Sequence, residues 1–163
     1  MNKLHGKEPL IIVDLQRAFP PPKAFVERVW RYSRRFPYRI FTRFVNPAGS
    51  LFRTKLKRRA CAPGSRDLEL LIAPDRGDIV IAKQGYGLSA ASVKKIKALK
   101  PRRVTVCGVD TDACVLGVMF SLFDAGIECR VHKDMCYSSA GLHSEAMKII
   151  EEQFPTPKKR RKK

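Results

Sequence analysis

A cysteine follows an apolar strand and a glycine-containing turn in the stretch from Val104 to Val115, VTVCGVDTDACV. This pattern places Cys114 at the start of a predicted helix. A helix N-terminus carries partial positive charge and unpaired N–H groups, so a thiol placed there can have a lowered pKa and act as a nucleophile. The same pattern also fits a buried cysteine that only packs, which is the commoner role of a free cysteine.

Two further ionisable residues stand at the ends of apolar strands. Asp14 follows the run from Pro9 to Val13, and Lys83 follows the run from Asp78 to Ala82. In an open α/β sheet the active crevice lies beyond the carboxyl ends of the strands, so three strands can bring Asp14, Lys83 and Cys114 to one point. Taken singly, Asp14 can cap a turn and Lys83 can be solvated. Together they make a set of acid, base and nucleophile.

The elements that must position these side chains alternate along the chain. Apolar runs predict strands, and segments of helical periodicity separate them. This order favours a parallel sheet covered on both faces, with right-handed crossovers. We expect strands at 9–14, 38–45, 78–83, 103–109 and 127–132, helices near 22–35, 89–99, 112–125 and 141–153, and irregular chain over 46–66.

Length and composition predict a single globular domain. A chain of 163 residues is near the common domain size and can bury a sizeable core. It has no apolar stretch near the ~20 residues that span a bilayer and no signal-peptide pattern, so we expect a cytoplasmic protein. Five cysteines without paired CxxC spacing indicate neither a disulfide framework nor a zinc cluster. We assign residues 1–154 to the domain and residues 155–163 to a disordered basic tail.

The order and spacing of several motifs resemble the isochorismatase-like cysteine hydrolases. This superfamily includes nicotinamidases, N-carbamoylsarcosine amidases and ureidoacrylate amidohydrolases. The resemblance runs from Pro9 to Phe154, and it implies a Rossmann-like, doubly wound, mostly parallel sheet of five to six strands with helices on both faces. The matching stretches are IIVDLQ, PGS with the following DLELL, GDIVIAKQGYGLSA, CGVDTDACV, SLFDAG and KDMCYSSAGLHSEAM.

The resemblance implies that Asp14, Lys83 and Cys114 are the catalytic triad of an amidohydrolase. Such an enzyme cleaves a carbon–nitrogen bond of a small amide or ureido substrate through a covalent thioester. Asp14 would be the general base, Lys83 would keep Asp14 ionised, and the backbone N–H groups of Asp110 and Cys114 would form the oxyanion hole. By the same resemblance the Val109–Asp110 peptide bond is cis and the protein is a homo-oligomer.

The loops beyond these strands supply candidates for the substrate pocket. For each of these residues, ordinary loop packing is at least as good an explanation as a role in the substrate pocket. Asp112 is better explained as a helix N-cap than as a catalytic group, and Thr111 is an alternative cap. The pocket candidates are Phe19, Tyr86, Ser89 and the side chain of Asp110.

The chain departs from its relatives in its histidines. Nicotinamidases carry an Asp-x-His pair and a further downstream histidine that bind a divalent metal. The histidines of this chain, His5, His132 and His143, do not reproduce that set. We therefore expect no metal and no cofactor. Isochorismatases proper tend to lack the nucleophilic cysteine, so Cys114 indicates an amide or ureido substrate.

The net charge of +18 is concentrated at the two ends of the chain. Residues 1–60 hold 15 Lys and Arg against 3 acids, and the last six residues are all basic. This pattern predicts a basic arc over the first helix and the 53–59 loop, plus a basic tail that resembles a nuclear localisation signal. The alternative function is therefore a catalytically idle scaffold that binds nucleic acid or another polyanion through residues 1–60 and the tail. A third explanation is that the charge steers a small anionic substrate.

Overall fold

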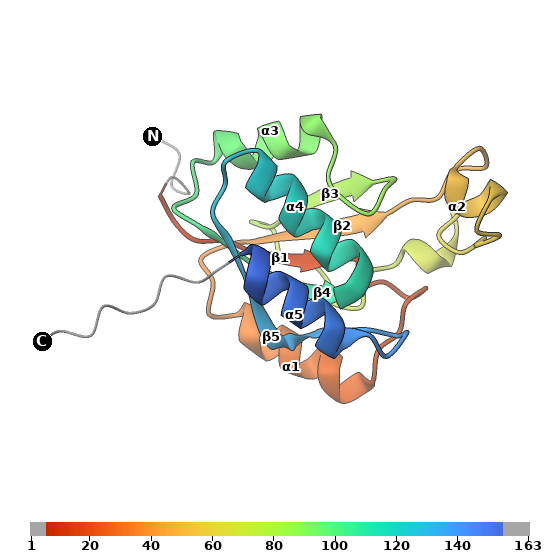
Figure 1. Cartoon of the computed structure of the whole chain (residues 1–163), viewed down its shortest axis with the longest axis horizontal. Helices are drawn as coiled ribbons and strands as arrows, with labels where there is room; N and C mark the ends of the chain where they lie inside the picture. The colour runs from red at the N-terminus through yellow and green to blue at the C-terminus, as the bar shows by residue number, and fades with distance from the viewer. Residues whose placement is uncertain (1–5, 155–163) are drawn as a thin grey trace, which may run out of the picture.

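A five-stranded sheet, with all its strands parallel, forms the centre of the protein (Figure 1). The computed structural model describes residues 6–154. The strand order is β3-β2-β1-β4-β5. The elements are β1 (Leu10–Val13), α1 (Lys23–Ser33), β2 (Arg39–Phe44), α2 (Leu51–Thr54), η1 (Arg66–Leu68), β3 (Ile79–Lys83), α3 (Ala90–Ala98), β4 (Val104–Val109), η2 (Thr111–Val115), α4 (Leu116–Asp124), β5 (Cys129–Tyr137) and α5 (His143–Gln153).

Helices cover both faces of the sheet, which explains why its central strands are almost fully buried. Every residue of β1 and of β4 is buried. In Figure 1 α3, α4 and α5 lie on the near side of the sheet. Right-handed crossovers place α1 on the other face, where Phe25 and Val29 join the core. The doubly wound α/β fold predicted from the sequence is confirmed.

The five predicted strands and the four predicted helices are present, and two segments differ from expectation. A short helix, α2, forms inside the segment predicted to be irregular, because the Ser50 side chain accepts a hydrogen bond from the Arg53 N–H and caps it. Strand β5 continues to Tyr137, beyond its predicted end at 132. Its pairing with β4 shifts register between Val106 and Gly108, so the apolar pattern of the sequence breaks before the strand ends.

Gly108 sets how closely β1 and β4 approach at their carboxyl ends. It pairs with Val13 and has a φ of +122°, a conformation that disfavours other residues. A Cβ atom at this position would collide with the backbone of Val13. Glycine therefore allows the segments that carry Asp14 and Cys114 to leave the sheet side by side.

Two predictions fall on parts of the chain that the structure does not describe. The basic tail at 155–163 lies outside the described residues, as does any strand that follows α5. Within residues 6–154 no helix combines the length and the apolar character needed to cross a membrane.

Candidate active site

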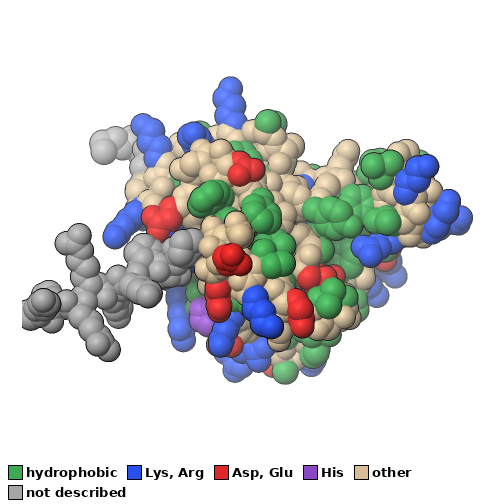
Figure 2. All heavy atoms as spheres, in the orientation of Figure 1, with side chains coloured by type: hydrophobic (Ala, Val, Ile, Leu, Met, Phe, Trp, Pro, Cys, Tyr) green, Lys and Arg blue, Asp and Glu red, His purple; other side chains and the backbone are tan. Residues whose placement is uncertain are grey.

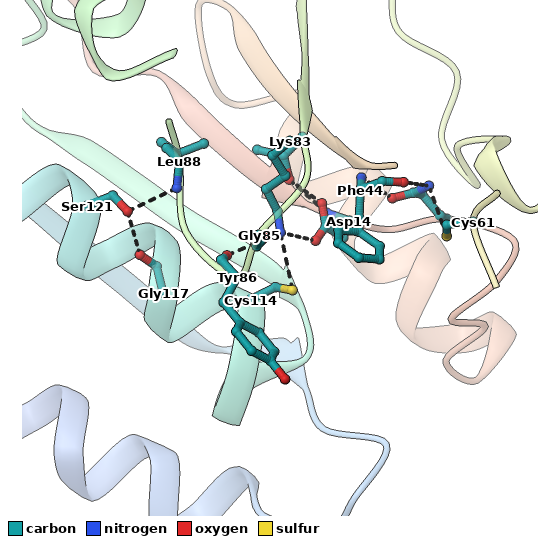
Figure 3. A network of polar contacts seen from close by, with 12 residues as sticks. Asp14, Phe44, Cys61, Lys83, Gly85, Tyr86, Leu88, Cys114, Gly117 and Ser121 are labelled. Atoms are coloured by element: carbon teal, nitrogen blue, oxygen red, sulfur yellow. Dashed lines mark hydrogen bonds and ion pairs between the residues drawn. The ribbon is translucent and has the colours of Figure 1, made fainter. Parts of the chain in front are cut away.

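Lys83 lies between the other two residues of the predicted triad (Figure 3). Its Nζ is 2.7 Å from Asp14 Oδ2 and 3.3 Å from Cys114 Sγ. Asp14 directly follows β1, Lys83 ends β3, and Cys114 lies in η2 after β4. The structure thus brings the three residues together at the carboxyl edge of the sheet, where crevices of this fold form.

The ammonium group of Lys83 is buried and fully surrounded by acceptors. The side chain is 1% exposed, and Nζ also donates to the backbone oxygens of Gly85 (2.7 Å) and Tyr86 (3.2 Å). The loop that supplies these oxygens packs tightly on α4, because a Cβ atom on Gly117 would approach the Tyr86 backbone to 2.8 Å. A buried charge needs such partners, and these fix Nζ beside Sγ.

Asp14 has one carboxylate oxygen bonded to Thr42 and the other paired with Lys83. Its φ is +45°, a left-handed conformation in which aspartate is enriched. The Thr42 hydroxyl donates to Asp14 Oδ1 (2.6 Å) and accepts from the Asp14 N–H (3.1 Å). Oδ2 pairs with Lys83 and receives no hydrogen bond from the other residues described. Oδ2 therefore contacts the same ammonium group that contacts Cys114 Sγ.

Cys114 lies in a π-helical turn ahead of α4. The backbone oxygen of Asp110 accepts from the N–H groups of Ala113 and Val115, both at 3.1 Å. The N–H of Cys114 is not bonded to that oxygen, and the Val109–Asp110 peptide bond is cis. Single π turns are frequent at functional sites because they reorient the local backbone.

The surroundings of Cys114 favour the neutral thiol over the thiolate. Burial, followed by the negative charge of Asp14, raises the pKa of Cys114 to about 12, against a lowering effect of Lys83. The sequence predicted a lowered pKa from the helix N-terminus alone. Desolvation outweighs that effect here, so the sulfur needs a nearby base to become a nucleophile.

A small cavity beside Cys114 connects with a wider surface cleft. Their volumes are ≈ 60 Å³ and ≈ 690 Å³, and they share several lining residues. The inner cavity is lined by Asp14, Phe19, Phe44, Asn46, Phe52, Arg58, Ala60, Tyr86, Val109, Asp110, Ala113 and Cys114.

Three of the four predicted pocket residues line this cavity, and one does not. Phe19, Tyr86 and Asp110 line both the cavity and the cleft. Ser89 instead caps α3, where its hydroxyl accepts from the N–H of Ser92 at 3.2 Å. Ser89 lines neither the cavity nor the cleft, because a serine just before a helix satisfies that helix's first N–H groups.

The two acidic residues beside the nucleophile differ from expectation. Asp110, rather than Asp112, occupies the N-cap position of η2, and Thr111 lies inside the turn. The Asp110 carboxylate accepts from the N–H (2.8 Å) and the hydroxyl (3.0 Å) of Ser139. The predicted capping role of Asp112 is wrong, because the turn begins earlier than the sequence pattern indicated.

Asn46 is a residue of the cavity wall that the sequence reasoning missed. It is buried, and its amide nitrogen donates to the backbone oxygens of Arg58 and Ala60, both at 3.0 Å. Its amide oxygen accepts from the Ser50 hydroxyl. Asn46 thereby holds the 50–60 loop over the cavity. The available signal was its position just after a strand, the same signal that identified Asp14 and Lys83.

Solved structures of amidases share this fold. A pyrazinamidase from Pyrococcus horikoshii in complex with zinc is 21% identical over 91% of this chain and 96% of its own, with a TM-score of 0.80. An N-carbamoylsarcosine amidase from Thermoplasma acidophilum is 16% identical, with coverages of 91% and 92% and a TM-score of 0.76. A nicotinamidase from Bacillus subtilis is 16% identical, with coverages of 91% and 96% and a TM-score of 0.74. No curated protein matches the chain by sequence.

The residues at this cavity do not fit a metal ion. The carboxylate of Asp14 is engaged by Thr42 and Lys83, and that of Asp110 by Ser139. A metal site needs three or four N, O or S ligands around one point. Across the described part of the chain, no three His, Cys, Asp or Glu side chains are grouped in that way.

The family of the chain follows from its sequence as well as its fold. The family model of the isochorismatase domain matches residues 9–157, which include every element of the structure. The solved structures that share the fold carry the names of amidases. This protein therefore belongs to the isochorismatase domain family.

Proposed function

We propose that this protein is a cysteine-dependent hydrolase that cleaves the carbon–nitrogen bond of a small amide or ureido compound. One observation carries the proposal: a buried ammonium lies beside a cavity in contact with both a half-buried thiol and a buried carboxylate. Membership of the isochorismatase family and the amidase names of the structural neighbours support it.

The first half of the reaction transfers the acyl group to sulfur. Cys114 Sγ attacks the carbonyl carbon while its proton moves to Asp14 Oδ2, and the carbonyl electron pair moves onto oxygen. Lys83 compensates the charge on sulfur, and the N–H groups of Asp110 and Cys114 bind the oxyanion. Such donors contribute about 2.7 to 4 kcal/mol each in other enzymes. The C–N bond then breaks, and the amine leaves with the proton from Asp14.

The second half hydrolyses the thioester. Water attacks the thioester carbon, and Asp14 takes the proton of that water. The C–S bond breaks and sulfur recovers the proton from Asp14, which returns the site to its resting state. Lys83 keeps its contacts with Asp14, Gly85 and Tyr86 through both halves of the reaction. The sum is one amide and one water converted to one acid and one amine.

The test is release of ammonia from a panel of small amides and ureido compounds. Cys114→Ala should abolish release while circular dichroism shows an intact fold. Cys129→Ala is the matched control, because Cys129 is buried in β5 with its thiol directed at the backbone oxygen of Met119 (3.6 Å). A Cys114→Ala enzyme as active as the natural one would end the covalent proposal.

The basic surface supports a second candidate function, binding of nucleic acid or another polyanion. Blue side chains gather over α2 and the loop after it (Figure 2), and the residues responsible are exposed. These residues are Lys55, Lys57, Arg58 and Arg59. Binding to random-sequence RNA that weakens steeply with salt would support this candidate, and no binding even at low salt would remove it. The homo-oligomer and the cytoplasmic or nuclear location stay predictions.

A further inference from the structure

Aromatic rings form one wall of the cavity beside Cys114. The rings of Phe44 and Phe52 are 4.8 Å apart, those of Phe52 and Tyr86 are 4.9 Å apart, and Phe19 lies 6.3 Å from Phe44. Such a wall favours flat or apolar groups. A volume of ≈ 60 Å³ corresponds to about four water molecules, so the inner cavity admits a short group only.

Arg58 lines both the inner cavity and the outer cleft, and its backbone is fixed there. Its N–H donates to the backbone oxygen of Phe52 (2.8 Å), and its own backbone oxygen accepts from Asn46 (3.0 Å). The residue is therefore held at the junction between the two spaces, on the side formed by the 50–60 loop.

The Arg58 guanidinium has no carboxylate at ion-pair distance among residues 6–154, whereas Arg34, Arg39 and Arg103 each have one. The acids that line the inner cavity are already engaged: Asp14 by Lys83 and Asp110 by Ser139. Asp112 lines only the outer cleft. Arg58 thus lines both spaces and carries an exposed guanidinium that no carboxylate of the described residues pairs.

We propose that Arg58 selects an amide whose acyl group is short, flat and ends in a carboxylate, that is, the monoamide of a small dicarboxylic acid. The inference rests on the proposed hydrolase function. The amide carbonyl lies at Cys114, the carbon chain between the aromatic rings, and the carboxylate at Arg58. A guanidinium binds a carboxylate through two parallel hydrogen bonds, a contact that a neutral amide of the same shape lacks.

The kinetic test uses oxamate, malonamate and fumaramate, each paired with the neutral amide in which a methyl group replaces the carboxylate. The natural enzyme should give the higher kcat/KM with the anionic member of a pair. Arg58→Gln should lower that value about 10- to 100-fold, the range for hydrogen bonds to a charged group, and spare the neutral member. Lys55→Gln removes a charge from the same loop, lines neither space, and should change neither value. A preference for the neutral amide, or an equal loss with both, would overturn the inference.

A second test does not depend on turnover. Iodoacetate and iodoacetamide both alkylate a thiol: the C–S bond forms, iodide leaves, and Asp14 takes the proton. Iodoacetate carries a carboxylate where iodoacetamide carries a neutral amide. The ratio of their alkylation rates at Cys114 therefore reports selection for an anion. Mass spectrometry identifies the alkylated cysteine. We expect Arg58→Gln to lower the iodoacetate-to-iodoacetamide ratio about tenfold and Lys55→Gln to leave it unchanged.

The two tests separate the inference from the proposed function. An unchanged ratio in Arg58→Gln rejects selection by Arg58, even where Cys114→Ala establishes the hydrolase. A ratio that falls in Arg58→Gln supports the anion site, even in a protein that hydrolyses no member of the panel.

Discussion

At the scale of single residues, Asp14 and Lys83 form a buried ion pair that depends on further hydrogen bonds. Both side chains are 1% exposed. Removing two charges from water costs free energy that their attraction repays only with good geometry and further hydrogen bonds. Here those bonds come from Thr42, Gly85 and Tyr86, and the pair holds a base and a cation beside a thiol.

Replacing Lys83 tests whether its attraction to Asp14 offsets the cost of burying the two charges. Lys83→Met should lower the free energy of unfolding by about 3 to 5 kcal/mol, because it leaves the Asp14 carboxylate buried without its partner. Urea denaturation measures the loss. Adding Asp14→Asn to Lys83→Met should recover part of it, because the second change removes the unpaired charge. A Lys83→Met protein as stable as the natural one would mean that the pair is not buried as the structure has it.

At the scale of elements, the sequence was sufficient to predict which side chains meet at the ends of the apolar strands. Asp14, Lys83 and Cys114 each stand after such a run, and parallel topology brings strand ends together. Thr42 was beyond this reasoning, because its contact with Asp14 depends on the register of β1 against β2. The contact between Ser139 and Asp110 could not be predicted either, because it depends on the path of a loop that no local sequence pattern gives.

The loop held by Asn46 gives a prediction at this scale. Asn46→Ala leaves two backbone oxygens without their donor, which should lower the free energy of unfolding by about 1 to 3 kcal/mol. The freed loop carries four exposed basic residues between Lys55 and Arg59, so trypsin should cut it faster. Thr54→Ala, which removes an exposed hydroxyl from the same loop, is the control and should change stability by less than about 0.5 kcal/mol. Unchanged cleavage in Asn46→Ala would show that other contacts hold the loop.

At the scale of the whole molecule, buried thiols link stability to alkaline pH. Burial raises the pKa of Cys114 and Cys136 from 9.0 to about 12, and it raises the pKa of Cys107 well above 9.0. Below pH 9 both the folded and the unfolded chain keep these protons. Between about pH 9 and 12 only the unfolded chain releases them, so rising pH favours unfolding.

Cys136 alone should reduce the free energy of unfolding by about 1.4 kcal/mol for each pH unit between about pH 9 and 12, and the other thiols with raised pKa values add to that fall. Urea denaturation on either side of pH 9 measures the slope. Cys136→Ala should reduce the slope by about 1.4 kcal/mol per pH unit, whatever its effect on stability at neutral pH. A stability independent of pH in this range would contradict the burial of these thiols.

The central claim is that Asp14 takes the proton of Cys114, and the rate of iodoacetamide alkylation at Cys114 against pH tests it most directly. In the natural protein the proton passes within the site, so the rate should change little between about pH 6 and 9. In Asp14→Asn the rate at neutral pH should be about 10²-fold lower and should rise with pH, because the thiol must then lose its proton to water. A natural protein whose rate rises tenfold per pH unit, with Asp14→Asn no slower, would contradict the account.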